Sequence, residues 1–351
     1  MNRRELLRAL AVLASARAVL AAAGAPAARL GLCSFSSHQH WRAAGTKHPG
    51  VKFSDALGFY RHARELGGAG VQTGLRGATT ETARELRALV ERDGGYYEAE
   101  LRLPRQEGET AAFEKDVALA RAAGATVARA VFTSGRRYEE FKTAAAFREY
   151  HDRARQILAR IEPIARRHRL KIAIENHKDL TTDEQVTLIR GLASEWIGVL
   201  VDTGNNLALL EEPYATMEAL APFALSVHLK DMALQPAPDG FLLSEVPLGT
   251  GFLDLPRIVA TLRRANPALV LNLEMATRDP LRIPCLTDGY YATFPADYRA
   301  RLLAPALARV QAHPPRGPVP AVAGKPTDQV LAEEEAHNRH GLAWMKTNLR
   351  T

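Results

Sequence analysis

Eight short runs typical of buried β-strands recur along the chain, and each is followed by a longer stretch with helical spacing. In stretches such as "FSDALGFYRHARELGG" and "EYHDRARQILARIEPIARRHR", apolar residues recur three and four positions apart. Thr182 and Gln185 have the spacing of a capping box at the start of one such helix. This alternation is typical of parallel βαβ units and predicts a (β/α)8 TIM barrel. The predicted strands span residues 30–35, 70–74, 96–102, 126–132, 170–175, 197–202, 225–230 and 269–274.

A doubly wound open sheet is the alternative arrangement for the same alternation. Such sheets usually bind a nucleotide on a glycine-rich loop after the first strand. No such loop follows the first predicted strand. The "GTG" at residues 249–251 does not directly follow a strand, so it is weak evidence for a nucleotide site and is explained at least as well by a flexible turn. A single composition regime predicts one barrel domain over residues 29–313. Residues 314–351 are expected to form an irregular linker and a C-terminal helix packed on the outside.

The composition favours a packed globular domain and argues against a nucleic-acid partner. Hydrophobic residues make up 46% of the 351 residues, which is ample for a core. The formal net charge is +7, but no basic run is interleaved with aromatic residues, so we expect no nucleic-acid binding. Cys33 and Cys285 are the only cysteines, which excludes a disulfide scaffold and predicts two buried free thiols.

Residues 1–28 have the order of regions expected of an export signal. The basic start "NRRELLR" precedes an Ala/Leu-rich run that ends in "AAAGAPAA". The Arg3 and Arg4 pair resembles a twin-arginine signal, although Arg17 interrupts the apolar region. We expect a periplasmic or otherwise exported protein, with a cytoplasmic protein that keeps a surface helix as the alternative. The segment is too short and too interrupted for a stable membrane span.

The last four predicted strands share a polar residue at the C-terminal end. Residues two apart in a strand lie on the same face. The apolar face of a barrel strand packs under helices, so the polar residues on the other face should point into the barrel. The C-terminal ends of the strands are also where barrel enzymes carry their chemistry. The four residues are Glu175, Asp202, His228 and Glu274.

These four side chains together predict a metal site. Three carboxylates that close would repel and take up protons unless a cation lay among them. Three oxygen donors and one imidazole suit an octahedral divalent ion. A single strand-end aspartate or histidine has a simpler explanation, but four in the same structural position favour metal binding. Mn²⁺ is the expected ion, with Mg²⁺, Co²⁺ and Zn²⁺ as alternatives.

The segments around the four residues resemble the motifs of a known family. "IENH", "VDTGN", "SVHLKD" and "LNLEM" are similar to the strand ends of the xylose isomerase-like TIM-barrel superfamily, in particular its sugar phosphate isomerase/epimerase branch and the ketose 3-epimerases. The resemblance covers nearly the whole chain after residue 29. It implies that the four residues bind a divalent metal and that Glu175 and Glu274 also form the acid/base pair. Such a pair could remove and return a proton next to a metal-polarised carbonyl.

Two departures from the family patterns narrow this expectation. Ketose 3-epimerases usually place a histidine a few residues after the metal-binding aspartate, where this chain has Asn205. The apurinic-site endonucleases of the superfamily use additional histidine ligands, but Gln72 and Glu100 stand at the matching strand ends here. A simple ketose epimerase is therefore in doubt, and DNA repair is disfavoured.

Eight further residues are candidates for substrate binding. Those after the first strand could contact sugar hydroxyls and a ring face, or could belong to a solvated loop. Lys230 could hold a substrate oxygen or form a salt bridge with a nearby acid such as Asp231, and the remaining candidates lie just beyond the ligands. The eight are His38, His40, Trp41, Asn176, His177, Asn205, Lys230 and Arg278.

The predicted function is a metal-dependent sugar isomerase or epimerase that moves a proton through an enediolate. A lyase or dehydratase acting on a keto-sugar or related polyol-ketone could use the same site, because it needs the same enolate stabilisation. A sugar-binding module without turnover is a further alternative, although binding alone would not require two bases. In each case the partner is a small carbohydrate.

Overall fold

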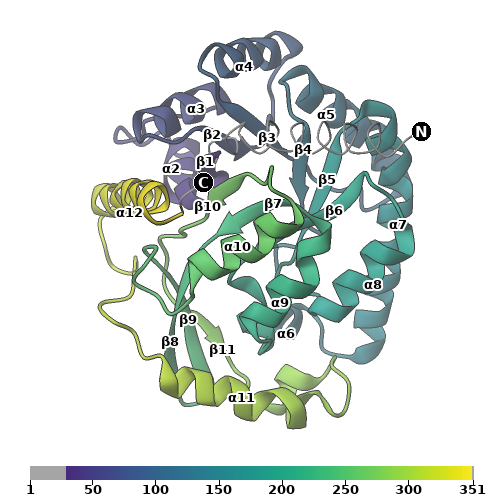
Figure 1. Cartoon of the computed structure of the whole chain (residues 1–351), viewed down its shortest axis with the longest axis vertical. Coiled ribbons are helices and arrows are strands. Elements are labelled where there is room, and N and C mark those ends of the chain that lie inside the picture. Colours follow the sequence, from purple (N-terminus) through teal and green to yellow (C-terminus); the bar gives the residue numbers. More distant parts are fainter. Residues whose placement is uncertain (1–28, 350–351) are drawn as a thin grey trace, which may run out of the picture.

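The structure is a computed structural model that describes residues 29–349, and its centre is a closed barrel of eight parallel strands (Figure 1). Around the barrel the strands follow the order β1, β10, β7, β6, β5, β4, β3, β2. Because β1 pairs with both β2 and β10, the predicted TIM barrel is confirmed and the open sheet is excluded. The barrel strands are β1 (Leu30–Cys33), β2 (Gly70–Thr73), β3 (Tyr96–Glu100), β4 (Val127–Ala130), β5 (Lys171–Glu175), β6 (Ile197–Asp202), β7 (Ala224–Leu229) and β10 (Leu271–Leu273).

Helices surround the barrel and connect its strands (Figure 1). Several begin at a side chain that accepts a backbone N–H of the first turn, as Asp55, Thr79 and Thr143 do. The α-helices are α2 (His38–Gly45), α3 (Ala56–Glu65), α4 (Thr80–Arg92), α5 (Thr110–Ala122), α6 (Arg137–Glu140), α7 (Ala144–His168), α8 (Thr182–Leu192), α9 (Pro213–Leu220), α10 (Leu255–Ala265), α11 (Tyr298–Ala312) and α12 (Thr327–Asn348). Short 3-10 helices are η1 (Ser34–Ser37), η2 (Glu107–Glu109), η3 (Asn205–Leu209), η4 (Ala221–Phe223) and η5 (Asp288–Tyr291).

The capping box of α8 lies one residue earlier than predicted. Thr181 is the N-cap: its hydroxyl accepts the N–H of Glu184, and the Glu184 carboxylate accepts the N–H of Thr181 at 2.8 Å. Gln185 instead donates to the carbonyl oxygen of Ile174. The three-residue spacing fits the pair beginning at Thr182 as well. The pair with a glutamate is preferred because a carboxylate also interacts favourably with the positive end of the helix dipole.

The pairing of the strands sets the depth of the polar residues in the barrel. Asp202 of β6 stands opposite His228 of β7, and His228 stands opposite Asn272 of β10. On the other face of β5, Ile172 and Ile174 are fully buried in the apolar core. The predicted division between an apolar outer face and a polar inner face at the strand ends therefore holds in these strands.

A three-stranded antiparallel sheet follows β7, and the sequence interpretation did not include it. β8 (Asp231–Ala237) and β9 (Gly240–Val246) form a hairpin, and β11 (Leu281–Ile283) pairs with β9. The Asp231 carboxylate accepts the N–H groups of Gly249 and Gly251, each at 2.9 Å. The "GTG" segment is therefore a turn held by Asp231 after the hairpin.

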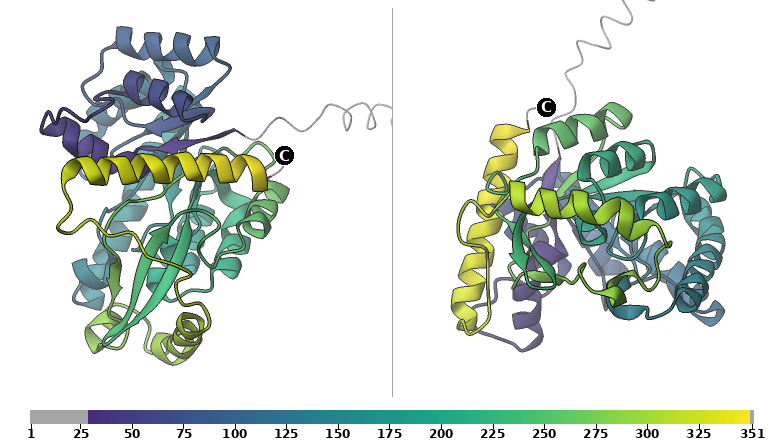
Figure 2. Two further views of the ribbon diagram at one scale, coloured as in Figure 1. Left: turned by 90° about the vertical axis from the view of Figure 1, so that its left-hand side faces the viewer. Right: turned by 90° about the horizontal axis from the view of Figure 1, so that it is seen from below.

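Helix α12 packs against β1, β10 and α2 along the side of the barrel (Figure 2). Two of its buried side chains bond to the segment that follows β1. The Glu334 carboxylate accepts the N–H groups of Gln39 and His40 at 2.8 and 3.0 Å, and Asn338 Nδ2 donates to the carbonyl oxygen of Ser36 at 2.8 Å. The end of the described chain is thus joined to its beginning.

Within residues 29–349, no helix combines the length and the apolar character that crossing a membrane requires. Cys33 and Cys285 are both buried and free, in agreement with the prediction. The predicted export signal at residues 1–28 lies outside the described residues.

Candidate metal centre

The four residues predicted as metal ligands meet at the C-terminal mouth of the barrel. Glu175 and Asp202 end β5 and β6, His228 lies near the end of β7, and Glu274 directly follows β10. All four side chains are buried. Each offers one potential ligand atom, and these atoms all lie within 4.8 Å of one another.

Two of these atoms face a charged neighbour without completing a hydrogen bond of good geometry: Oδ2 of Asp202 lies 2.8 Å from Lys230 Nζ, and Nδ1 of His228 lies against Glu274 Oε2. Three buried carboxylates so close together repel one another, which favours a cation among them. Carboxylate oxygens and an imidazole nitrogen are ligands of divalent ions such as Mn²⁺ and Zn²⁺. The residues present therefore fit a divalent metal.

Lys230 brings a positive charge to the same carboxylates. Its side chain is 1% exposed, and its Nζ lies 2.8 Å from Asp202 Oδ2 and 2.7 Å from Glu274 Oε1. Burial raises the pKa of Asp202 to about 6, and Lys230 opposes this only in part. For Glu274, Lys230 and His228 outweigh burial and hold the pKa well below its usual value. Of the two alternatives for Lys230, the structure shows ion pairs, but their partners differ from the suggested Asp231.

A buried hydrogen-bond chain fixes the orientation of His228. Its Nε2 donates to Gln72 Oε1 at 2.6 Å, and Gln72 Nε2 donates to Glu98 Oε2 at 2.8 Å. The same Glu98 oxygen accepts hydrogen bonds from Ser226 at 2.7 Å and Asn272 at 2.9 Å. Because Nε2 donates to Gln72, the nitrogen that faces the carboxylates is Nδ1, and it could bind a metal ion after losing its own proton.

Arg129 of β4 holds Glu175 from the opposite side of the cluster. Its Nε and Nη2 lie 2.7 and 2.6 Å from Glu175 Oε2, and Asn205 Nδ2 donates to Oε1 at 3.0 Å. Burial alone would raise the pKa of Glu175, but Arg129 and then His228 outweigh it and lower the pKa to about 2. Glu175 is therefore ionised at neutral pH.

Lys178 also lies in the site, four positions before the helix α8 begins. Its buried Nζ donates to Asn205 Oδ1, which also accepts Lys230 Nζ at 3.3 Å. Burial and then repulsion from Lys230 lower the pKa of Lys178 to about 8. Burial and Lys178 lower the pKa of the neighbouring His177 to about 3, so this half-buried ring is neutral at pH 7.

Asn176 and Arg278, two of the substrate-binding candidates, contact neighbouring protein groups. Asn176 Oδ1 accepts the N–H of Asp202 at 2.6 Å, and its Nδ2 donates to the Asp202 carbonyl at 2.9 Å, so Asn176 positions the backbone of Asp202. Arg278 donates to Glu245 of β9 at 2.5 and 2.9 Å. Glu245 is buried and lies 3.6 Å from Lys230.

The three candidates after β1 occupy α2 and have different surroundings. His38 and Trp41 line a cavity of about 740 Å³ that also reaches Arg129. His40 is not among the residues that line this cavity. Its Nδ1 lies 2.7 Å from Glu334 Oε2 of α12, and both side chains are buried. His40 thus joins two helices in this structure.

Three charged residues of the site, Arg129, Lys178 and Glu245, are not among the sequence candidates. Arg129 lies on the inward face of β4, so the two-residue period applied to the fourth strand would identify it. Glu245 belongs to the hairpin, whose signal is the Asp239 and Gly240 pair between two apolar runs. Lys178 lies in a loop after β5, where no periodic pattern identifies it.

A family model described as xylose isomerase-like TIM barrel matches residues 60–292. Among solved structures, the chain is similar to L-ribulose 3-epimerase, with 15% identity and a TM-score of 0.57 over 92% of this chain and 94% of that one. D-psicose 3-epimerase from Clostridium cellulolyticum H10 gives 10% identity and a TM-score of 0.55 over 81% and 98% of the two chains. A zinc-bound protein, IOLI, gives 13% identity and a TM-score of 0.50 over 81% and 95%. These similarities show the fold.

A segment of the chain is similar in sequence to 3-oxo-isoapionate decarboxylase of Pectobacterium atrosepticum. The identity is 28% over 122 residues, which are 34% of this chain and 44% of that enzyme. The uncharacterised protein YihM of Escherichia coli is 32% identical over 71 residues, 20% of this chain and 22% of that protein. The chain therefore matches less than half the length of these relatives.

Proposed function

Because the chain belongs to the xylose isomerase-like TIM-barrel family, we propose that it is a metal-dependent enzyme that moves a proton on the carbon next to a sugar carbonyl. The observation that carries this proposal is the convergence of three carboxylates and His228 within 4.8 Å. Buried charges are costly unless they are paired or hold an ion. The three carboxylates would repel one another, and a bound ion would reduce that repulsion.

The donor set supports Mn²⁺ as the first choice among divalent ions. When bound, the ion would polarise the carbonyl oxygen and stabilise the negative charge of an enediolate. The residues that would hold it are Glu175, Asp202, His228 and Glu274.

Glu175 and Glu274 are the proposed acid/base pair. Both are ionised at neutral pH, because Arg129 lies against Glu175 and Lys230 lies against Glu274. In an epimerase, one carboxylate takes the proton from the carbon and the other, in its protonated form, returns a proton to the opposite face. In an isomerase, one carboxylate moves the proton between neighbouring carbons. His228 lies against both glutamates, so it orients the pair.

Decarboxylation of a keto-sugar acid is the second candidate, and the similarity to 3-oxo-isoapionate decarboxylase favours it. In this reaction the bond to the carboxylate breaks, carbon dioxide leaves and its bonding electrons enter the carbonyl system. The resulting enolate is the same kind of anion as in isomerisation. Glu175 or Glu274, in its protonated form, would then give the proton to carbon.

The experiment that tests the leading proposal measures proton exchange. The Mn²⁺-loaded protein is incubated in deuterium oxide with a panel of ketoses, 3-keto sugars and keto-sugar acids, and deuterium at carbon is measured by mass spectrometry. We expect deuterium next to the carbonyl of a substrate. Release of carbon dioxide from keto-sugar acids, with deuterium only in the product, would support the second candidate. Binding without either reaction would instead support a sugar-binding module.

Variants then separate chemistry from metal binding. Glu175→Gln and Glu274→Gln keep the side-chain size and an oxygen donor but lose the basic oxygen. We expect turnover to fall by about 10²-fold or more. Metal content is measured in parallel, and Glu195→Gln on the surface is the control. Near-normal turnover in metal-loaded variants of both glutamates would rule out the proposed proton transfer.

A further inference from the structure

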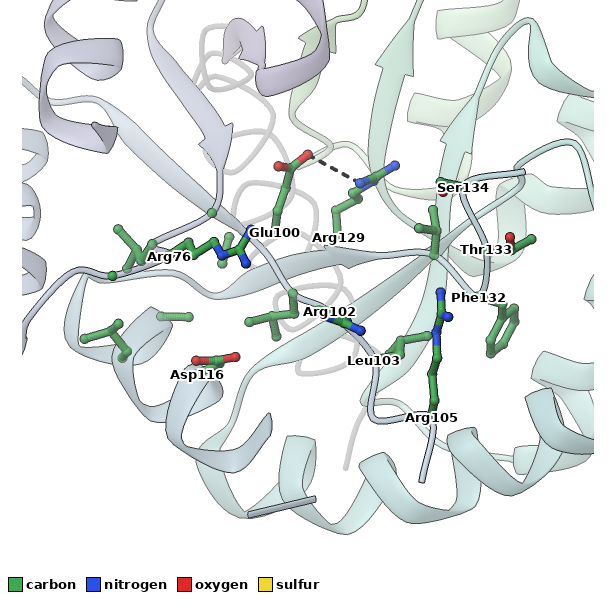
Figure 3. A pocket seen from close by; sticks show the side chains of 18 of the residues that line it. Arg76, Glu100, Arg102, Leu103, Arg105, Asp116, Arg129, Phe132, Thr133 and Ser134 are labelled. Atoms are coloured by element: carbon green, nitrogen blue, oxygen red, sulfur yellow. Dashed lines mark hydrogen bonds and ion pairs between the residues drawn. The ribbon is translucent and has the colours of Figure 1, made fainter. Parts of the chain in front are cut away.

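A second cavity, of about 600 Å³, begins beside the metal centre and passes over the ends of β3 and β4 (Figure 3). Its inner end is formed by Glu100 and Arg129, whose carboxylate and guanidinium are 3.4 Å apart. Arg129 also contacts Glu175, so Arg129 lies between this cavity and the proposed acid/base pair. Its outer end reaches Asp116 and Leu119 of α5.

Three further arginines line this cavity, and two of them, Arg102 and Arg105, lie near Glu109 without forming a side-chain ion pair with it. Arg76 follows β2, and Arg102 and Arg105 follow β3. Figure 3 shows their side chains around the same space. In the described part of the chain, none of the three forms an ion pair, whereas many other exposed arginines do, such as Arg87 with Glu91 at 2.7 Å. We call these three residues the arginine group.

The carboxylates of the cavity do not balance the arginine group. Glu100 is already paired with Arg129, which leaves Asp116 as the unpaired acid. The remaining walls are largely apolar and include Leu103 and Phe132. A cleft lined by one sign of charge, with walls of low dielectric constant, concentrates the field and attracts ions of opposite sign.

We propose that the arginine group binds an anionic group, a carboxylate or a phosphate, carried by the sugar at a position away from the reacting carbonyl. Guanidinium groups bind both anions through paired N–H donors. The cavity volume lies in the range of small-molecule sites. This proposal deepens the proposed function and rests on it for the reacting end of the substrate. It makes the substrate a sugar acid or a sugar phosphate.

Binding of matched sugar pairs to the full-length, Mn²⁺-loaded protein tests the proposal. Calorimetry compares D-galacturonate with D-galactose and D-fructose 6-phosphate with D-fructose, so that each pair differs in its anionic group. We expect the anionic member of at least one pair to bind about tenfold more tightly or better. The preference should weaken as salt is added. Tighter binding in the first pair identifies a carboxylate, and in the second a phosphate.

Variants locate the anion. In the double variant Arg102→Gln/Arg105→Gln, the preference for the anionic sugar should fall to about twofold or less. Arg84→Gln, an exposed arginine of α4 outside the cavity, is the matched control and should keep the preference. Equal binding of both members in both pairs, or an unchanged preference in the double variant, would overturn the proposal.

The calorimetric test of the arginine group can succeed or fail independently of the proton-transfer proposal. Calorimetry measures binding without turnover, while deuterium exchange reports on Glu175 and Glu274. A protein that exchanges deuterium into neutral ketoses but shows no preference for anions would keep the proposed function and lose the arginine site. The opposite result would keep the arginine site and remove the proton-transfer mechanism.

Discussion

Lys230 Nζ lies 2.8 Å from Asp202 Oδ2 and 2.7 Å from Glu274 Oε1, two oxygens that a metal ion in this centre would also attract. The lysine is 1% exposed, so water does not screen its charge. The carboxylates are thus partly neutralised by a residue of the chain itself. A metal ion and Lys230 would share the task of balancing their charge.

The first prediction follows from this sharing. Lys230→Met removes the internal cation, so the metal-free protein should lose roughly 3–5 kcal/mol of unfolding free energy, the cost of leaving buried charges unpaired. Mn²⁺ should restore much of the loss, because an ion that binds only the folded chain stabilises it. The measurement is the melting temperature with Mn²⁺ and with a chelator. The difference between these two melting temperatures should be larger in Lys230→Met than in the parent protein, and it should be unchanged in Lys115→Met, a surface control. If this difference is the same in Lys230→Met as in the parent protein, Lys230 does not share the charge balance of the metal centre.

The second prediction concerns the support of His228. Gln72→Leu removes the acceptor of the His228 Nε2 proton and the link to Glu98. Metal affinity should fall about 10- to 100-fold, as it does when a residue behind a metal-bound histidine is removed. Titration with a competing chelator measures this change, and circular dichroism checks that the barrel remains folded. Wild-type affinity in a folded variant would contradict the proposed role of His228 Nδ1.

The third prediction uses the buried pair of Asp179 and Tyr150. The Tyr150 hydroxyl donates to Asp179 Oδ2, but burial dominates and raises the pKa of Asp179 to about 6. Since an unfolded aspartate has a pKa near 3.9, the unfolded chain releases this proton first as the pH rises. This group therefore lowers stability between about pH 4 and pH 6, by about 3 kcal/mol in total.

Asp179→Asn removes this titration. Its unfolding free energy relative to the parent protein should rise by about 3 kcal/mol from pH 4 to pH 7. Tyr150→Phe provides the matched comparison: it removes a donor that stabilises the carboxylate, so the window of decreasing stability should extend to higher pH. Urea unfolding at several pH values measures both effects. Parallel pH profiles for the parent and Asp179→Asn would show that the pKa of Asp179 is the same in the folded and unfolded chain.

The fourth prediction concerns the bond between α2 and α12. Glu334→Ala leaves two buried N–H groups and His40 Nδ1 without their acceptor. The unfolding free energy should fall by about 3 kcal/mol. The control is Glu333→Ala on the same helix, whose half-buried pair with Lys325 should contribute less than about 1 kcal/mol. If both variants lose the same unfolding free energy, the buried contacts of Glu334 stabilise the protein no more than the half-buried pair of Glu333.

The fifth prediction tests export through residues 1–28. If Arg3 and Arg4 form a twin-arginine signal, replacing both with lysine should leave the protein in the cytoplasm. Cell fractionation of the parent and the variant measures this directly. Export of the variant at the level of the parent would exclude this route, and a cytoplasmic parent would favour the uncleaved helix.

Much of the barrel was predictable because a parallel strand buried on its outer face leaves a local pattern. Residues 197–202 illustrate this: Val199 and Val201 are apolar on one face, and Asp202 ends the strand on the other. The two-residue alternation of faces can be recognised within a single strand. Closure of the sheet into a barrel then brings the C-terminal ends of the strands together. The same rule predicts that His228 lies beside Asp202, and the pairing of β6 with β7 confirms it.

The environment of His40 could not be predicted in this way. Its partner Glu334 lies 294 positions further along the chain, and no local spacing links α2 to α12. The contact depends on how the last helix packs against the barrel, which is a property of the whole fold. Glu245 is a similar case, because the hairpin that carries it leaves the barrel and returns to the site through tertiary packing.

The position of α12 also has a consequence for the synthesis of the protein. β1 completes the barrel only by pairing with β10, and α12 then covers β1. Until α12 has emerged from the ribosome, β1 therefore lacks part of its cover, although β1 precedes all other described strands in the chain. The nascent chain must keep that apolar surface from aggregating until α12 has been made, so this part of the core is completed only after α12 has left the ribosome.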